Sequence, residues 1–198
     1  MDGTLTLPGA IDFNAMYSRN NFDRNNGDIL TQINRLSNDN DKKRAHEIII
    51  EEEIKGIERM QIREHLSLLI ESLNNNNINV AISTRNNEDA LYKILEVAQL
   101  KPDQFTHLLH RDSINIDGNM INKPDPRVAL HVINHWNVNP ITDDIYFVGD
   151  SDDDIYCGLH ANTKTCLVRT SYNKHLESKV DIAVDSLLEF AKHIRIVN

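Results

Sequence analysis

The sequence predicts an α/β fold, a Rossmann-like parallel sheet with helices on both faces and a small α-helical insert near the N-terminus. From residue 62 onward, short apolar segments alternate with amphipathic helical segments, a pattern typical of a parallel sheet covered by helices. Residues 12–61, by contrast, are polar, have helical spacing and carry no strand signal. We therefore expect a core built from residues 1–11 and 62–198, with residues 12–61 forming a separate helical domain.

The composition is that of a globular protein long enough to bury a sizeable core. The chain has 198 residues, of which 40% are hydrophobic and 26% charged. Its formal net charge of −9 argues against nucleic acid or an anionic membrane surface as a partner. The two cysteines fit a reducing compartment, and the sequence has neither a signal-peptide pattern nor an apolar run of about 18 residues. We therefore expect a cytoplasmic protein; its oligomeric state stays open.

Two helices are expected within the polar segment 12–61, because isoleucine and leucine recur there at helical spacing. Asn38 or Asp39 is a suitable N-cap for the second helix. The Asn- and Asp-rich segment 23–28 has the composition of a turn. The apolar positions are Ile29, Ile33, Leu36, Ile48, Ile49, Ile50, Ile54 and Ile57.

Beyond residue 62, each element is predicted from its own pattern. The proline at the start of segment 124–136 suits a first helical turn, and Asp185 is the expected N-cap of the last helix. Helical periodicity predicts helices over 63–73, 87–100, 124–136, 152–160 and 185–194. Short apolar runs predict strands over 78–84, 105–111, 144–150 and 163–169.

Four short motifs lie at or beside the ends of these elements, where open parallel sheets bind ligands. They are MDGTLT at the start of the chain, ISTRN at the end of the strand 78–84, NKPDP at the opening of the helix 124–136, and VGDSDDD at the end of the strand 144–150. In this order they resemble the motifs of the haloacid dehalogenase-like hydrolase superfamily, in its phosphatase type with a small inserted helical cap (phosphoglycolate phosphatase-like). The resemblance implies a Mg²⁺-dependent phosphomonoester hydrolase for a small phosphorylated metabolite.

The roles implied by the resemblance fit the needs of phosphoryl transfer, which requires charge to be neutralised around the transferred group. Asp150, at the end of a predicted strand, is an oxygen ligand for Mg²⁺. Asp154 lies one helical turn further on and either supports metal-bound water or orients a lysine. Lys123 supplies positive charge to the phosphate, although a lysine before proline can also be an ordinary solvated loop residue.

The remaining motifs supply the phosphate grip and the acid–base group in the same resemblance. Thr84 and its neighbouring backbone amides hydrogen-bond a phosphoryl oxygen, and Arg85 is a second phosphate-binding candidate. Ser83 is an alternative to Thr84, but the TRN sequence fits the family pattern better. Asp2 matches the aspartate that acts as general acid on the leaving group and as base on water, and whose backbone carbonyl is a metal ligand.

Other metal sites find no support in the sequence. The acidic run 150–154 is not a calcium-binding loop, because Ile155 and Ala161 stand where that loop needs glycine and glutamate. Asp152 and Asp153 are interpreted as exposed charge at a helix N-terminus. The nine histidines have no ligand spacing such as HExxH, so none is assigned to zinc.

The residue that would attack phosphorus is not among the 198. In the family it is an aspartate two positions before the one that Asp2 matches, which here is the position before Met1. One hypothesis is that the chain is part of a longer enzyme whose first, central strand lies upstream. The other is a complete, catalytically inactive phosphate- or partner-binding protein. Under either hypothesis we expect little turnover by this chain through an aspartyl-phosphate.

The substrate is left open by the sequence. The predicted cap lies between the first two motifs and would close over the site, so its inward side chains would select the leaving group, and it offers eight basic residues to an anionic substrate. A phosphomutase would use the same catalytic residues, whereas the carboxylates of a magnesium site argue against dehalogenation. The basic residues are Arg19, Arg24, Arg35, Lys42, Lys43, Arg44, Lys55 and Arg59.

Overall fold

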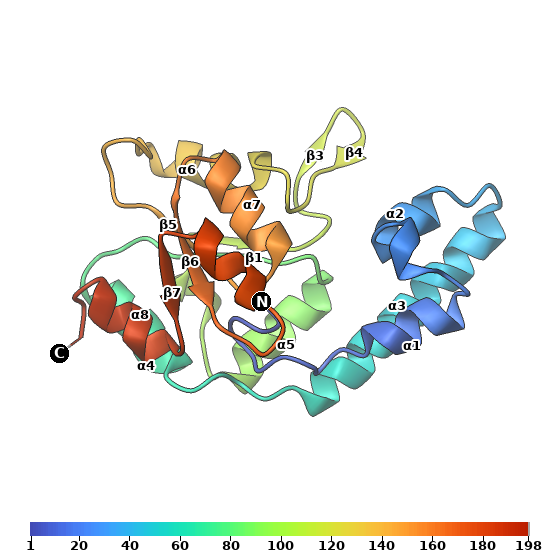
Figure 1. The fold of residues 1–198 in the computed structure, drawn as a ribbon, viewed down its shortest axis with the longest axis horizontal. Coiled ribbons are helices and arrows are strands. Elements are labelled where there is room, and N and C mark those ends of the chain that lie inside the picture. The colour runs from blue at the N-terminus through green and yellow to red at the C-terminus, as the bar shows by residue number, and fades with distance from the viewer. Residues whose placement is uncertain (198) are drawn as a thin grey trace. The chain divides into compact units, whose positions relative to one another are not determined.

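The computed structural model describes residues 1–197 and divides them into two compact units (Figure 1). One unit, the core unit, consists of residues 1–8 and 62–197, and the other, the helical unit, of residues 9–61. Residues 9–11, expected in the core, belong to the helical unit. Their placement follows from Ile11, which is buried with Met16 and Ile33 in the hydrophobic cluster of that unit.

Apolar helix faces hold the helical unit together. Its elements are α1 (Phe13–Arg19), the 3₁₀ helix η1 (Arg24–Asn26), α2 (Ile29–Asn34) and α3 (Asp39–Arg59). Both α1 and α2 pack against α3. Asn38 caps α3 by accepting a hydrogen bond from the Asn40 amide at 2.8 Å, which confirms one of the two predicted cap residues. The buried side chains are Ile11, Met16, Ile29, Ile33, Ala45 and Ile49.

The core unit contains two groups of parallel strands and one short hairpin. The first group is β5 (Tyr146–Gly149), β6 (Lys164–Val168) and β7 (Ile182–Val184), in that order across the sheet. The second pairs β1 (Ala81–Ser83) with β2 (His107–Leu109). The antiparallel hairpin joins β3 (Asn115–Ile116) to β4 (Asn119–Met120).

Helices cover both faces of the parallel strands, as predicted. In the first group, α6 and α7 pack together on one side and α4 and α8 on the other (Figure 1). The helices are α4 (Leu66–Asn75), α5 (Glu88–Val97), α6 (Arg127–Trp136), α7 (Asp152–His160) and α8 (Leu187–His193), with 3₁₀ helices η2 (Pro102–Gln104) and η3 (Lys174–Lys179).

A cavity separates the two groups of parallel strands. Within the described chain, β1 pairs only with β2 and β5 only with β6, so the edges of β1 and β5 that face each other share no ladder. A cavity of about 110 Å³ lies there, lined by Ala81 of β1 and by the β5 residues 146–148. Apolar side chains of α6 form another wall, and Met1, Lys123 and Asp154 also line the cavity.

The cap predicted for the last helix is wrong by one residue. Ser186, not Asp185, is the N-cap of α8, and its side chain accepts a hydrogen bond from the Glu189 amide at 3.1 Å. Asp185 instead accepts from the Arg169 guanidinium at 3.2 Å. Both residue types are good N-caps, so composition alone does not distinguish two adjacent candidates.

The helices of residues 1–197 are each too short or too polar to pass through a lipid bilayer.

Candidate active site

The Asp2–Thr4 segment forms a tight turn against the end of β5. The Met1 carbonyl accepts hydrogen bonds from the amides of Thr4 at 3.2 Å and Leu5 at 2.8 Å. Gly3 has a φ of +76°, and a Cβ added to it would lie 2.0 Å from Oδ2 of Asp150. Only glycine fits this backbone and this space, so the glycine of the DGT motif places the turn directly on Asp150.

Asp150 follows β5 and is buried, with hydroxyl groups donating to both carboxylate oxygens. Thr4 Oγ1 donates to Oδ1 at 2.7 Å, and the Tyr172 hydroxyl donates to Oδ2 at 2.7 Å. Asn173 Nδ2 donates to the Asp150 carbonyl oxygen at 2.8 Å. Burial raises the pKa of Asp150, while the hydrogen bonds from Tyr172 and Thr4 oppose that rise.

Lys123 and Asp154 form a buried ion pair beside this carboxylate. Lys123 Nζ donates to Asp154 Oδ1 at 2.6 Å and to the Ser83 carbonyl at 2.9 Å. Ser151 Oγ donates to Asp154 Oδ2 at 2.7 Å, and the backbone amides of Asp150 and Ser151 donate to the same oxygen at 3.2 Å. Burial alone would raise the pKa of Asp154, but the charge of Lys123 and its hydrogen bond hold that pKa well below its usual range.

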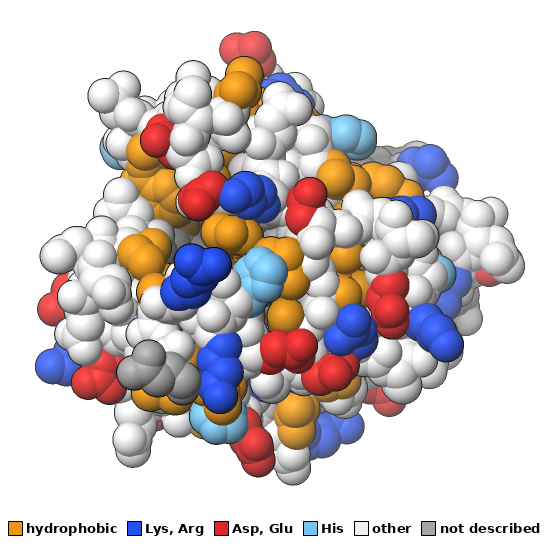
Figure 2. Space-filling model, turned by 60° about the vertical axis from the view of Figure 1, so that its left-hand side comes forward, with side chains coloured by type: hydrophobic (Ala, Val, Ile, Leu, Met, Phe, Trp, Pro, Cys, Tyr) orange, Lys and Arg blue, Asp and Glu red, His pale blue; other side chains and the backbone are white. Residues whose placement is uncertain are grey.

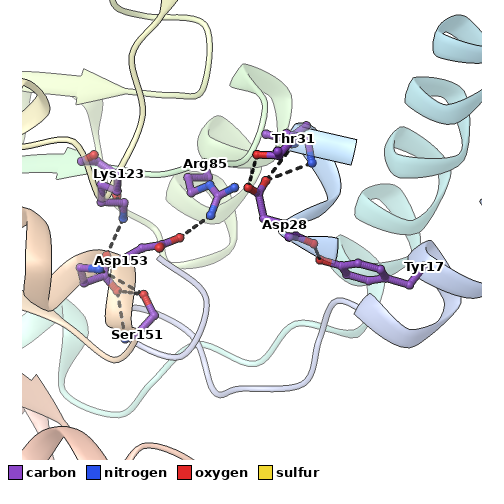
Figure 3. A network of polar contacts seen from close by, with 11 residues as sticks. Tyr17, Asp28, Thr31, Arg85, Lys123, Ser151 and Asp153 are labelled. Atoms are coloured by element: carbon purple, nitrogen blue, oxygen red, sulfur yellow. Dashed lines mark hydrogen bonds and ion pairs between the residues drawn. The ribbon is translucent and has the colours of Figure 1, made fainter. Parts of the chain in front are cut away.

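The end of β1 carries the third part of the site. Thr84 Oγ1 accepts a hydrogen bond from the Asn86 amide at 3.1 Å, and Asn86 Nδ2 donates to Asp2 Oδ2 at 2.9 Å. Arg85 forms an ion pair with Asp153 of α7. Figure 3 draws this pair next to the hydrogen bonds that Lys123 and Ser151 make with α7. The strand ends β1 and β5 therefore carry polar groups linked by hydrogen bonds.

Hydrogen bonds and ion pairs within the core unit thus join the chain segments that carry the sequence-predicted site residues. Asp2 is joined to the end of β1 through Asn86, while Thr4 joins the same turn to Asp150. Lys123 joins the Ser83 carbonyl to α7. The roles proposed for Thr84, Arg85 and the other site residues stay predictions, but their juxtaposition comes directly from these contacts.

Four partners of these residues are not predicted by the sequence analysis. Tyr172 and Asn173 lie between β6 and η3 and fix Asp150, and Asn86 holds Asp2. Arg63 donates to the Gly3 carbonyl oxygen. A polar residue in a loop gives no local signal of such a role, although Asn86 lies within the ISTRN motif itself.

The donor set at the end of β5 fits a hard divalent cation. Asp150 is a buried carboxylate whose raised pKa reflects burial, and a cation would offset the cost of keeping that charge out of water. The backbone carbonyl of Asp2, in the turn that Thr4 ties to Asp150, is a further hard oxygen of the kind that Mg²⁺ prefers. Asp154 differs, because its negative charge is already compensated by the Lys123 ammonium group, which donates to Oδ1. Its geometry matches the lysine-orienting alternative.

The cysteines are not candidate nucleophiles. Both are buried, and burial raises the pKa of Cys157 to about 11 and that of Cys166 to about 12. Since the thiolate is the reactive form, both side chains are unreactive thiols at neutral pH. Cys157 packs in the hydrophobic cluster beneath α6 and α7, as expected from its place in a helix.

Comparison with known proteins finds a match to a family model and to a yeast protein. A protein-family model described as haloacid dehalogenase-like hydrolase matches residues 10–168. An uncharacterised hydrolase of Saccharomyces cerevisiae is 31% identical over 205 residues, which cover 100% of this chain and 89% of the yeast protein.

Solved structures share the fold at low sequence identity. A hydrolase from Pseudomonas syringae has a TM-score of 0.75 and 16% identity, covering 98% of this chain and 94% of its own. A predicted phosphoglycolate phosphatase from Haemophilus somnus has a TM-score of 0.65 and 19% identity, covering 83% of this chain and 72% of its own. Because both sequence identities are below 25%, these two similarities show a shared fold only.

Proposed function

Since the chain belongs to the haloacid dehalogenase-like hydrolase family, we propose that its site serves the Mg²⁺-dependent hydrolysis of a small phosphomonoester. The observation that carries this proposal is the hydrogen-bonded assembly of Asp2, Thr84, Lys123, Asp150 and Asp154 at the ends of β1 and β5. The carboxylates suit the binding of a divalent cation, and that cation together with the buried lysine suits the binding of a phosphate anion.

Each side chain has a proposed role that agrees with its contacts. Asp150 and the Asp2 backbone carbonyl would hold Mg²⁺, which when bound supplies positive charge to the phosphate oxygens. Lys123, held in place by Asp154 and the Ser83 carbonyl, would supply a second, fixed positive charge to the phosphate. The Thr84 hydroxyl donates to a phosphoryl oxygen.

Arg85 is proposed as a supplementary phosphate-binding group rather than a required one. Its guanidinium is engaged by Asp153, so a phosphate oxygen would have to share or displace that carboxylate. A guanidinium offers five donors in a planar fork, which allows two acceptors at once.

The Asp2 carboxyl group is the proposed acid and base. A carboxylate two positions before Asp2, outside the 198 residues, would attack phosphorus and break the ester P–O bond while Asp2 protonates the leaving oxygen. Asp2 would then take a proton from water as the water oxygen attacks phosphorus, which releases phosphate and restores the carboxylate. Met1 lines the cavity between β1 and β5, which supports this placement of the preceding residue.

The helical unit is proposed as the cap that selects the substrate. It is inserted between the first two motifs, and it carries eight basic and ten acidic side chains, so an anionic metabolite would be recognised by individual basic groups and not by the net charge of the segment. The net charge of −9 argues against nucleic acid as the partner, and acidic and basic side chains are interspersed on the face in Figure 2.

Phosphate release from a panel of phosphorylated metabolites tests the proposal, using the 198-residue chain and a chain extended upstream through its in-frame codons. We expect the extended chain to turn over at least one substrate with Mg²⁺ and to lose activity with a chelator. Asp2→Asn should lower its rate by about 10²–10⁴-fold, whereas Asp144→Asn, an exposed control, should leave it unchanged.

Three outcomes would contradict parts of the proposal. Turnover of haloacids but not of phosphate esters would overturn the reaction class. Hydrolysis by the 198-residue chain itself, abolished by Asp2→Asn, would overturn the placement of the nucleophile. Binding of inorganic phosphate without turnover by the extended chain would favour the inactive, phosphate-binding alternative.

A further inference from the structure

Three histidines from two separate elements, β2 and α6, lie together at the start of β2. His107 opens β2, and His131 and His135 lie one turn apart on α6. The ring centroids of His107 and His135 are 4.8 Å apart, and the other two ring pairs are 5.9 and 6.0 Å apart. One ligand nitrogen of each ring lies within 4.8 Å of those of the other two.

We propose that His107, His131 and His135 form a binding site for a divalent transition-metal ion of the Zn²⁺ class. Zn²⁺ binds imidazole nitrogen at about 2.0–2.1 Å in tetrahedral geometry, which sets ligand nitrogens about 3.3 Å apart. His131 and His135 are exposed, so modest side-chain rotations close the remaining gap. Three histidines then leave the fourth position to water.

The hydrogen bonds around His107 suit a metal ligand. Thr106 Oγ1 donates its only proton to the Val80 carbonyl at 3.0 Å and accepts from Trp136 Nε1 at 2.7 Å. It lies 3.2 Å from His107 Nδ1, and we assign it as acceptor from that nitrogen too. The Nε2 lone pair of His107 is then available to a metal, with Thr106 fixing the ring as an outer-shell partner does.

The cluster is distinct from the candidate active site. His107 pairs with Ala81 at the start of the β1–β2 ladder, whereas Thr84 follows its other end. On α6, His135 lies next to the C-terminal end and His131 lies one turn before it, while Lys123 precedes the N-terminal end. The ligand chemistry also differs, because imidazole favours Zn²⁺, Ni²⁺ or Cu²⁺ and the oxygen ligands of the active site favour Mg²⁺.

The sequence contains a signal for part of this site. His131 and His135 are four residues apart, the spacing that places two side chains on one face of a helix. The HExxH pattern requires a glutamate that is absent here, so a search for that motif passes over the pair. The third ligand comes from a strand 24 positions earlier in the chain, and only the fold brings it to the helix.

Isothermal titration of the untagged 198-residue chain with ZnCl₂, in buffer containing excess Mg²⁺, tests the proposal. We expect the unmodified chain to bind one Zn²⁺. His131→Gln and His135→Gln should each bind Zn²⁺ more than about 100-fold more weakly, which is a larger loss than the removal of an outer-shell partner causes. His193→Gln, an exposed histidine on α8, should bind as the unmodified chain does.

Two further readouts separate this site from adventitious surface binding. Trp136, the single tryptophan, shares Thr106 with His107, so Cu²⁺ should quench its fluorescence in the unmodified chain and not in His131→Gln. Thr106→Val keeps all three ligands and should weaken Zn²⁺ binding about 10–100-fold. No saturable Zn²⁺ binding by the unmodified chain, or equal binding by His131→Gln, would overturn the proposal.

Discussion

Lys123 and Asp154 illustrate how single residues couple stability to the proposed chemistry. Both are buried, and their ion pair is completed by the Ser83 carbonyl and by Ser151. Neither side chain can be removed without leaving the other as an uncompensated charge away from water. The pair that fixes the proposed phosphate-binding lysine is therefore also a structural requirement of the core unit.

Removing either partner should destabilise the protein strongly. We expect Lys123→Met or Asp154→Asn to lower the free energy of unfolding by about 3–5 kcal/mol, measured by urea denaturation. Lys164→Met is the matched control, because Lys164 pairs with Asp144 on the surface and should cost less than about 1 kcal/mol. Equal losses in the buried and surface pairs would contradict the assignment.

The same pair makes a specific contribution to acid sensitivity. The folded-state pKa of Asp154 is depressed, so the stability it contributes is fully present above the unfolded carboxyl pKa of about 3.9 and is lost as pH falls further. In Asp154→Asn, the free energy of unfolding should therefore fall less steeply below pH 4 than in the unmodified chain. Urea titrations at pH 7, 4 and 3 measure this slope, and parallel curves would refute the claim.

Gly3 should tolerate no side chain at all. In Gly3→Ala, the positive φ costs about 1–2 kcal/mol and the clash with Asp150 adds about 1–3 kcal/mol. Gly118→Ala isolates the first term, since Gly118 also has a positive φ but nothing within 4 Å of an added Cβ. Thermal unfolding of the two variants measures the difference, and equal shifts would show that Asp150 does not constrain the turn.

At the scale of elements, local signals predict most of the core unit, and tertiary contacts decide the rest. The predicted strand over 163–169 becomes β6, because a run of Cys, Leu and Val is buried on both faces. The strands of the hairpin β3–β4 are exposed and only two residues long each, so no hydrophobic pattern marks it. β7 is only three residues long, too short for a periodic signal.

The cap of α8 gives a quantitative test at this scale. Ser186→Ala removes the acceptor of the Glu189 amide and should lower the free energy of unfolding by about 1 kcal/mol. Asp185→Ala removes an exposed ion pair with Arg169 and should stay within about 0.5 kcal/mol. Urea denaturation of both variants decides which residue is the cap, and the reverse order would restore the sequence-based assignment.

The candidate site was predictable from the sequence in its residues but not in their partners. The motif residues lie at strand ends, and parallel topology brings such ends to one edge of a sheet. The supports of Asp150 come from Tyr172 and Asn173, more than 20 positions away, where nothing local distinguishes them from other loop residues. For the proposed histidine site, the sequence signals only His131 and His135, four residues apart, whereas His107 reaches α6 only through the fold.

At the scale of the whole molecule, the helical unit enters and leaves the core at one place. Thr6 and Ile62 form an antiparallel bridge, and the Arg63 amide donates to the Leu5 carbonyl at 2.9 Å. These bonds belong to the core unit and hold the two flanks of residues 9–61 together. The core unit therefore has the means to keep its fold when the inserted segment is changed.

Replacing residues 9–61 with a short Gly/Ser linker should leave the core unit folded. We expect circular dichroism to show retained strand content, and unfolding to remain cooperative. The reason is that the Thr6–Ile62 bridge already holds together the two chain ends that the linker would join. In the extended chain, the same replacement should raise KM for the preferred phosphate ester and reduce discrimination among esters. An unfolded product would show that the helical unit is needed for the core.

The bridge between Thr6 and Ile62 also has an evolutionary consequence. An inserted segment whose two ends are already held side by side by hydrogen bonds can be lengthened, shortened or exchanged without shifting the register of any strand of the core unit. Descendants of such a scaffold can diversify in what they recognise while the reaction chemistry stays unaltered.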